Sequence, residues 1–410
     1  MFKYNKGYGF TFTLGRIWWV YMSNNNRNFS SRIDYGLLFI IFLLFVMSCL
    51  AIYSAQTTGQ YGENFVVKQI VWYAVGLTIA FLIMTLDADQ LKKMSWYLYG
   101  LGLLLLLGLI VAPEGLAPVI NGAKSWYKLP GLGSIQPSEM MKVFLIMALS
   151  ALIQNHHAKH RIRTMQTDFI LLMKIGLTTG VPLMLVMQQP DLGTSLVMIA
   201  IMIGMIFVSG ITWRILLPMF GGGLLLVGTI FYLVVWHPNI MEKYFHVKQY
   251  QFGRIYAWLD PYSHTSAEGY QLIKSLLAIG SGTTSGKGFG NKEVYLPEGH
   301  TDFIFAVIGE EYGFLGASAV IILFFMLIYN MTKIGLETKN EYNTYICVGV
   351  ICMLTFHVFE NIGMTIGLLP ITGIPLPFLS YGGSSLLGNM MALGLIFSIR
   401  YHHRKYMFSS

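Results

Sequence analysis

The chain has 410 residues, of which 55% are hydrophobic and only 11% are charged. A soluble globular domain carries about 25% charged residues, so this chain has too little polar surface to cover a water-soluble globule. Its formal net charge of +8 does not indicate nucleic-acid binding, because the basic residues occur in short segments between apolar runs, which is the pattern of membrane insertion.

Long apolar segments follow one another along most of the chain. A membrane-spanning helix needs roughly 20 mostly apolar residues, and apolar length combined with flanking charge predicts about ten such helices. They lie near residues 34–54, 66–86, 94–112, 138–155, 168–188, 191–210, 213–236, 302–331, 342–367 and 380–400. We therefore expect an all-α polytopic membrane protein.

The short segments between the predicted spans differ in charge on the two sides of the membrane. With the N-terminus inside, the basic residues fall mainly on the inner segments, whereas the short outer segments and their edges hold only Lys68, Lys124 and Lys128. Because positively charged loops are retained in the cytoplasm, this bias predicts that both termini are cytoplasmic.

One outer segment is far longer than the others. Residues 237–301 contain charges, prolines and glycines that the apolar runs lack, and a loop of this length is usually functional or disordered. Helical spacing of apolar residues over 269–279 predicts partial order within it. The expected organisation is a cytoplasmic or interfacial segment at 1–33, a single transmembrane catalytic domain at 34–400 and a cytoplasmic tail at 401–410.

Four polar clusters lie at the edges of the predicted spans, all toward the outer side. A charge at the membrane centre costs roughly 2.5–3.5 kcal/mol, so it is retained only with a partner or a function. In the first cluster, QPSEMMK at 136–142, Pro137 indicates a helix start, and Glu139 and Lys142 share a helix face. The pair is either a structural ion pair or part of a functional site.

The second cluster is QQPDLGTS at 188–195, a turn between two spans. Asp191 stands where a carboxylate caps the next helix, and capping competes with a role of Asp191 in binding a substrate. Gln189 precedes it in the same turn.

The third cluster is HTDFIF at 300–305. Asp302 begins a predicted span, where Thr301 is placed to cap the helix and the helix dipole favours an anion. Asp302 either belongs to this cap and only anchors the helix, or acts as a general base with access to water on one side and lipid on the other. Glu310 and Glu311, about two turns deeper, are expected to face the bundle interior.

The fourth cluster, at 363–383, includes the segment GLLPITGIPLPFLSYGG and contains three prolines within eight residues, which forbid a regular helix. Irregular backbone at membrane depth must be buried in protein or line a wet cavity. This segment, which includes Ser380, is therefore predicted to be a re-entrant or cavity-lining loop.

Other chemistries are excluded by missing motifs. The sequence contains no G-x-x-x-x-G-K-[ST] nucleotide-binding loop and no H-E-x-x-H zinc motif. His357 and Glu360 share a face of one predicted span and are expected to form an internal hydrogen bond. The three cysteines lie within apolar runs and are expected to be inert.

These stretches, taken in chain order, resemble the RodA/FtsW/SpoVE family of shape, elongation, division and sporulation proteins. The matching segments lie between about residues 121 and 390 and are NGAKSW, QPSEMMK, QQPDLGTS, WLDP, GYQLIKSLLAIGSG, GKGFGN, LPEGHTDFIFAVIGEEYG and GLLPITGIPLPFLSYGGSS. The wording ITGIPLPF is more similar to RodA than to FtsW. The chain departs from the family pattern at Lys124, where arginine is common, and at Thr283–Thr284, which replace a pair containing glycine.

The resemblance implies a peptidoglycan glycosyltransferase of the bacterial cytoplasmic membrane, with the division- and sporulation-type members as alternatives to the elongation type. Its implied substrate is lipid II, a disaccharide-pentapeptide on undecaprenyl diphosphate. Its implied partners are a class B penicillin-binding protein that cross-links the product, other elongation or division proteins, and membrane lipids. The aspartate of the HTDF motif, essential in the family, is Asp302 here.

These implications give a mechanistic hypothesis. Asp302 accepts the proton of the acceptor hydroxyl, and Lys142, Arg254 or a divalent cation (Mg or Mn) near Asp302 stabilises the leaving diphosphate. Glu139 orients Lys142, and no other cofactor is expected. Substrate contacts are expected from a set of polar residues at the four clusters and the long loop: Glu139, Lys142, Gln189, Asp191, Arg254, His300 and Ser380.

Two other classes of function compete with glycosyl transfer. A lipid flippase also needs polar residues in a helix bundle, but it should carry them through the full membrane depth, whereas here they gather toward the outer face. A scaffold that only recruits a partner does not explain the buried charges at Glu139, Lys142 and Glu310.

Overall fold

The computed structural model describes residues 34–57, 64–119, 122–129, 133–160, 162–237, 253–263 and 267–403. The predicted N-terminal segment, most of the C-terminal tail and parts of the long outer loop lie outside these residues, so the expectations for them stay predictions.

Eight helices in the described part of the chain are long and apolar enough to cross a membrane. They are α3 (Tyr35–Gln56), α4 (Phe65–Met84), α5 (Ala88–Val111), α6 (Pro137–Lys159), α7 (Met165–Met187), α9 (Trp213–Trp236), α13 (Ile304–Glu337) and α14 (Glu341–Thr365). With the shorter α8 (Leu192–Val208) and the more polar α15 (Gly383–His402), they correspond one to one to the ten predicted spans. The all-α polytopic architecture is confirmed.

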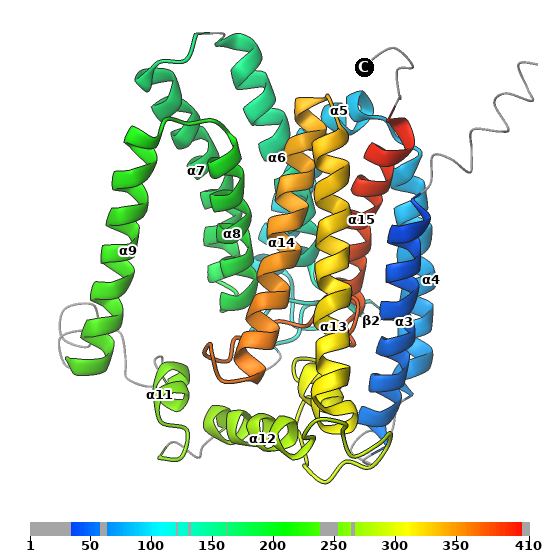
Figure 1. Ribbon diagram of the computed structural model, residues 1–410. Coiled ribbons are helices and arrows are strands. Elements are labelled where there is room, and N and C mark those ends of the chain that lie inside the picture. The colour runs from blue at the N-terminus through cyan, green and yellow to red at the C-terminus, as the bar shows by residue number, and fades with distance from the viewer. Residues whose placement is uncertain are drawn as a thin grey trace, which may run out of the picture.

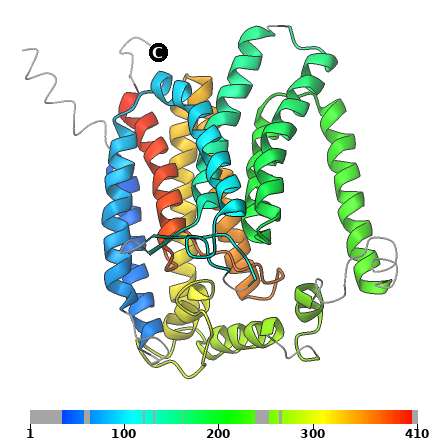
Figure 2. The same cartoon turned by 180° about the vertical axis from the view of Figure 1, so that it is seen from behind.

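The helices differ sharply in how much of their surface the protein covers. In α6, at the centre of the bundle, 17 of the 23 residues are buried, including charged ones. In α9, which stands apart from the other helices in both ribbon views (Figures 1 and 2), only Leu216 and Val234 are buried. A helix that is apolar all round is covered by protein or by lipid, and α9 is of the second kind.

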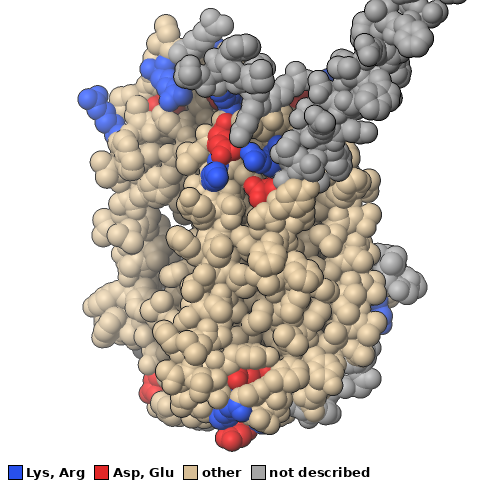
Figure 3. Space-filling view, turned by 45° about the vertical axis from the view of Figure 1, so that its right-hand side comes forward, with Lys and Arg blue, Asp and Glu red and all other residues tan. Residues whose placement is uncertain are grey.

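The two ends of the bundle carry different structures. At one end the start of α3 meets the end of α15, where Arg400 lies 3.9 Å from Asp34 and 2.9 Å from Glu337. At the other end, α12 (Ala267–Ser281) lies across the bundle, and the short α11 (Gly253–Leu259) lies between α12 and α9 (Figure 1). The predicted order at 269–279 is thus confirmed as α12. Charged side chains gather at the two ends on the face seen in Figure 3, with an uncharged band between them.

A break in α13 ties the long loop to the bundle. Gly313 has φ 62° and ψ −157°, a backbone conformation that is unfavourable for residues with a Cβ atom. The N–H groups of Phe314 and Leu315 donate instead to the carbonyls of Thr283 and Thr284, at 3.0 and 3.2 Å. The loop after α12 therefore completes the hydrogen bonding that the helix lacks. A short antiparallel hairpin, β1 (Tyr127–Leu129) and β2 (Gly133–Ile135), precedes α6.

Candidate active site

The HTDF segment forms a turn immediately before α13, at the end of the bundle that carries α12. The helix begins at Ile304 after Phe303, and no side chain caps it. The prediction that Thr301 caps the helix is wrong, because its hydroxyl donates to Glu298 Oε2 at 2.9 Å. The Asp302 side chain does not cap the helix either, so helix capping does not account for Asp302.

The Asp302 side chain lies against the proline-rich loop between α14 and α15. A Cβ atom added at Gly373 would stand 3.3 Å from Asp302 Oδ2. Gly373 has φ +75° and is exposed, whereas Asp302 is half-buried. The carboxylate is thus held at the boundary between the protein interior and its surroundings.

Asn361 of α14 binds the backbone of both the HTDF turn and the proline-rich loop. Its Nδ2 donates to the carbonyl of Asp302 at 2.7 Å and to the carbonyl of Ile374 at 2.8 Å. Asn361 is fully buried. One amide group therefore sets the spacing between the HTDF turn and the proline-rich loop.

Ser380 and Tyr381 add two further links between the same two segments. Ser380 Oγ donates to the carbonyl of Thr301 at 2.6 Å, and the Tyr381 N–H donates to the carbonyl of His300 at 2.9 Å. Together with the bond from Asn361, these contacts provide a hydrogen-bond donor for each of three successive carbonyls, at residues 300, 301 and 302. In this structure the predicted substrate ligand Ser380 has a positioning role.

The second half of the proline-rich loop, residues 376–380, is buried and anchored, as predicted for irregular backbone at membrane depth. From α3, Ser48 Oγ donates to the carbonyl of Leu379 at 2.8 Å, and from α4, Gln69 Nε2 donates to the carbonyl of Ser380 at 3.2 Å. The Tyr73 hydroxyl also donates to a carbonyl of this loop. Side chains from two spans thereby replace the backbone partners that three prolines remove.

The electrostatic surroundings of Asp302 favour a proton acceptor that works near neutral pH. Burial raises the pKa of Asp302 to about 7; the Glu298 carboxylate also raises it, and the Arg254 guanidinium lowers it. Arg254, predicted as a contact of the substrate diphosphate, thus acts on Asp302 through its charge. A base is most effective when its pKa lies close to the operating pH.

His300 packs beside this carboxylate segment as an aromatic spacer. Its ring stacks on Phe65 with centroids 4.5 Å apart, and the Tyr381 ring lies 5.8 Å away. Burial lowers the pKa of His300, which the Glu298 charge opposes. His300 therefore stays mostly neutral near pH 7.

A second polar group lies inside the bundle, where Lys142 of α6 has two partners. Its Nζ is 2.9 Å from Glu139 Oε2 and 3.1 Å from His357 Nε2, and the Lys142 and Glu139 side chains are only 2% and 7% exposed. The expected hydrogen bond between His357 and Glu360 is wrong, because Glu360 instead accepts one from Thr372 at 2.9 Å. Both partners come from other segments, α6 for His357 and the proline-rich loop for Glu360. The residue pattern within α14 does not indicate such contacts.

The turn between α7 and α8 contains two predicted substrate contacts, Gln189 and Asp191, and Asp191 has a structural role. Asp191 caps α8 by accepting from the Thr194 N–H at 3.0 Å and its hydroxyl at 2.7 Å, and Gln136 Nε2 donates to it at 2.8 Å. The Gln189 side chain is buried and has no hydrogen-bond partner within the described residues. Of Gln189 and Asp191, Gln189 is therefore the one whose side-chain amide can still form hydrogen bonds with a substrate.

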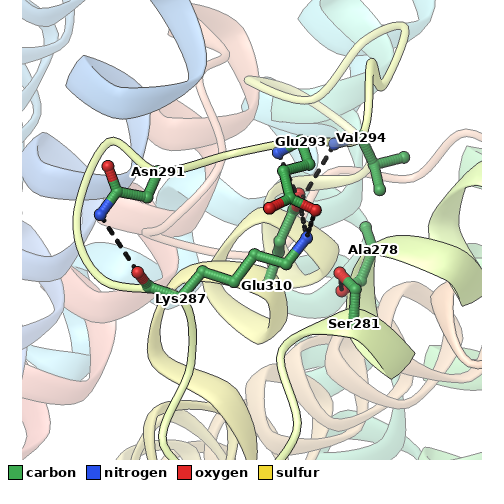
Figure 4. Close-up of polar contacts among 7 residues, drawn as sticks. All are labelled: Ala278, Ser281, Lys287, Asn291, Glu293, Val294 and Glu310. Carbon is green, nitrogen blue, oxygen red and sulfur yellow. Dashed lines mark hydrogen bonds and ion pairs between the residues drawn. The ribbon is translucent and has the colours of Figure 1, made fainter.

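Glu310 organises the loop that leads into the HTDF turn (Figure 4). Its Oε1 accepts from Lys287 Nζ at 3.1 Å and from the N–H groups of Glu293 and Val294 at 2.8 and 3.1 Å. Glu310 and Glu311 are each 1% exposed, which confirms that they face the interior. Glu311 in turn accepts from the Ser54 hydroxyl of α3.

The carboxylates at the HTDF turn are the groups to compare with the predicted divalent cation. The part of the chain that the structure describes contains no group of three or more His, Cys, Asp or Glu side chains placed to hold a metal. Asp302 and Glu298 are the two carboxylates that interact at the turn. Mg²⁺ is commonly held by one or two carboxylates together with substrate phosphates, so these residues fit a cation that arrives with a diphosphate.

One helix connects the two polar groups of the site. His357, Glu360 and Asn361 of α14 contact Lys142, Thr372 and the Asp302 carbonyl, respectively. The sequence interpretation did not assign a role to Asn361 or Gly373, although a buried amide in an apolar helix was a signal for the first.

Comparison with known proteins places these features in a family context. Residues 31–405 match the family of cell cycle proteins named for FtsW, RodA and SpoVE. The probable peptidoglycan glycosyltransferase FtsW of Coxiella burnetii is 34% identical over 366 residues, covering 88% of this chain and 92% of its own length.

Two solved structures resemble the fold over most of its length. A chain from a peptidoglycan synthase complex described as coordinating polymerization and crosslinking superposes with a TM-score of 0.74 at 29% identity, covering 90% of this chain and 97% of that one. The rod shape determining protein RodA of Thermus thermophilus superposes with a TM-score of 0.64 at 28% identity, covering 90% of this chain and 96% of its own.

Proposed function

The chain belongs to the FtsW/RodA/SpoVE family of cell cycle proteins, and we propose that it is a peptidoglycan glycosyltransferase that polymerises lipid II. The observation that carries the proposal is Asp302, a half-buried carboxylate with a pKa raised to about 7, fixed through its backbone beside an exposed glycine. A base in this position has access to both water and a lipid-linked sugar.

The chemistry is a single displacement at the anomeric carbon of the donor sugar. The acceptor hydroxyl loses its proton to the Asp302 carboxylate as its oxygen bonds to the anomeric carbon. The bond from that carbon to the diphosphate oxygen breaks, and the configuration inverts. General base catalysis of this kind typically accelerates a reaction roughly 10²–10⁴-fold. One carboxylate suffices, because no covalent intermediate with the enzyme is formed.

The departing lipid diphosphate requires positive charge. Lys142 supplies a buried ammonium whose charge Glu139 partly balances, and Arg254 supplies a guanidinium near Asp302. Fixed charges in a site shielded from water stabilise developing negative charge more than they would in water. Gln189 is a further candidate contact, since its buried amide has bonding capacity left.

A divalent cation, Mg or Mn, is proposed to accompany the diphosphate. Asp302 and Glu298 are the residues that would hold it, and its chemistry would be to neutralise phosphate charge. Chelation of divalent cations should then slow polymerisation, and the loss should be largest at low lipid II concentration.

The orientation and cellular role follow from the charge bias and the family. The end of the bundle with Asp302 and α12 is proposed to face outward, with both termini in the cytoplasm of a bacterial cell. The segment ITGIPLPF supports an elongation role of the RodA type over the division or sporulation roles. A class B penicillin-binding protein is the proposed partner, in keeping with the synthase complex that the fold resembles.

The test is polymerisation of fluorescent lipid II by the purified full-length protein, with and without its transpeptidase partner, resolved on a gel. The wild-type protein should form glycan chains, and Asp302→Asn should reduce the rate by about 10²–10⁴-fold. The unfolding temperature of this variant in detergent should not fall, because the amide removes a charge that burial disfavours. Glu293→Gln, which neutralises an exposed carboxylate of the outer loop, is the matched control and should polymerise normally.

Full activity of Asp302→Asn would remove Asp302 as the base. Transport of lipid II across vesicles by a protein that makes no polymer, alone or with its partner, would instead identify a flippase.

A further inference from the structure

Lys142 is held by residues of two different helices. Glu139 lies three residues earlier on the same helix, so this partner alone would leave the lysine side chain along α6. His357 approaches from α14, with its Nε2 at 3.1 Å from Lys142 Nζ. The second contact therefore draws the ammonium across the interface between α6 and α14.

The protonation of His357 follows from the chemistry of its partner. A lysine ammonium has three donors and no acceptor, so His357 Nε2 must accept and its proton must sit on Nδ1. The ring is 1% exposed, and Nδ1 has no partner among the described residues. A positively charged imidazole facing an ammonium would be repelled, so His357 serves here as a neutral acceptor.

His357 also shares a helix face with the residue that fixes Asp302. Residues four apart on a helix lie one above the other, so His357 and Asn361 occupy one face of α14. Asn361 binds the Asp302 carbonyl at 2.7 Å. A single turn of α14 thus connects the proposed diphosphate-binding charge to the proposed base.

We propose that His357 is a positioning residue that holds the Lys142 ammonium between Glu139 and α14, so that one N–H is left for the diphosphate of the lipid substrate. This inference rests on the proposed function. Without His357, the four rotatable bonds of lysine allow the ammonium to fall back along α6 toward Glu139, and affinity for the substrate falls.

The test exploits the two amides that resemble histidine. Glutamine places its side-chain oxygen near the position of Nε2, whereas asparagine places its oxygen near that of Nδ1. His357→Gln should therefore keep the acceptor for Lys142, and His357→Asn should lose it. Lipid II polymerisation kinetics of the full-length protein should show an unchanged KM for His357→Gln and a KM raised roughly tenfold, with kcat within about twofold, for His357→Asn.

Two controls separate positioning from folding. Met353→Leu changes a buried residue one turn away on the same face of α14 and should leave KM and thermal unfolding unchanged. In the Asp302→Asn background, which binds without turnover, fluorescent lipid II should lose no further affinity when His357→Asn is added to Lys142→Gln, because both substitutions remove the same contact.

A wild-type KM in His357→Asn, an equal loss in both His357 variants, or additive losses with Lys142→Gln would overturn the inference. Absence of polymer from the wild-type protein would count against the proposed function, whereas a normal Asp302 dependence with unaltered His357 variants would count only against the role of His357.

Discussion

Asp302 and Lys142, the two charged centres of the site, are held in opposite ways. Asp302 is positioned through its backbone, at carbonyls bound by Tyr381, Ser380 and Asn361, and its carboxylate makes no hydrogen bond within the described residues. Lys142 is positioned through its side chain by two buried partners. An unbound carboxylate suits the proposed base, which must exchange its proton, whereas a permanent charge inside a bundle needs partners at all times.

The largest effect should come from separating the buried pair. Lys142→Met leaves Glu139 as an uncompensated charge in the bundle, which costs roughly 3–5 kcal/mol of stability, and polymerisation should be lost. Thermal unfolding in detergent measures the first effect and the lipid II gel the second.

The double variant Glu139→Gln/Lys142→Met is the control for that pair. It should recover most of the stability but none of the activity, because it removes both charges. A Lys142→Met protein as stable as the wild type would show that the pair does not need both members.

The backbone-held centre should respond in catalysis more than in stability. Asn361→Leu removes the two hydrogen bonds that Asn361 donates to the HTDF turn and the proline-rich loop and leaves those of Ser380 and Tyr381 in place. A displacement of about 1 Å can cost 10²-fold in rate. We expect kcat to fall between about 10- and 100-fold with little change in KM. Asn330→Leu, at an exposed amide of α13, should behave as wild type.

A smaller displacement should follow from Gly373→Ala. The left-handed conformation at this position costs a residue with a Cβ roughly 1–2 kcal/mol, and the new atom stands 3.3 Å from Asp302 Oδ2. The strain should lower the unfolding temperature, and activity should fall by about tenfold because the added methyl group displaces the Asp302 carboxylate. Gly221→Ala, where no atom lies within 4 Å of the added Cβ, should leave the rate unchanged, and an equal loss there would point to a general effect of glycine replacement.

The smallest effects should appear in the pH dependence. The base form of Asp302 grows as pH rises through about 7, so kcat/KM should climb over this range and be about one-tenth of its plateau one unit below the pKa. Glu298→Gln should move the profile to lower pH, because a like charge is removed, and Arg254→Gln should move it to higher pH.

Folding stability should change with pH in the opposite sense. The pKa of Asp302 is raised on folding, so the native state binds more protons than the unfolded state between pH 3.8 and about 7, and the contribution of this group falls as pH rises across that window. A rate profile that is flat from pH 6 to 8 would contradict the assignment of the base.

Local patterns predicted the elements well, and long-range pairings poorly. Apolar length identified ten spans and the spacing of 269–279 identified α12, because each signal is contained in one helix. The pairing of Glu139 with Lys142 was also predicted from their spacing on one helix, whereas the role of Asp302 as a base came from the family resemblance and stays a proposal. The contact of Lys142 with His357 joins residues 215 apart, and no periodicity reports on such a distance, which is why His357 was paired with its helix neighbour Glu360 instead.

Capping was predicted unevenly for a related reason. Asp191 caps α8 as its position suggested, since the partners lie within one turn. Thr301 also stands just before a predicted helix, but its hydroxyl donates a hydrogen bond to Glu298, three residues earlier, and not to the helix. The role of Gly373 depends on Asp302 packing against it, and that packing exists only in the folded chain.

The exposure of α9 makes its orientation sensitive to the surrounding membrane. Only Leu216 and Val234 of this 24-residue helix are buried, although Phe220 stacks on Phe207 of α8 and the Val234 carbonyl accepts a hydrogen bond from the Tyr256 hydroxyl. The length of α9 is about 36 Å at 1.5 Å per residue. The hydrocarbon layer is about 30 Å thick, and a helix longer than that layer tilts to fit it. We therefore expect bilayer thickness to influence how far the exposed length of α9 leans, within the limits that its contacts with α8 and α11 allow.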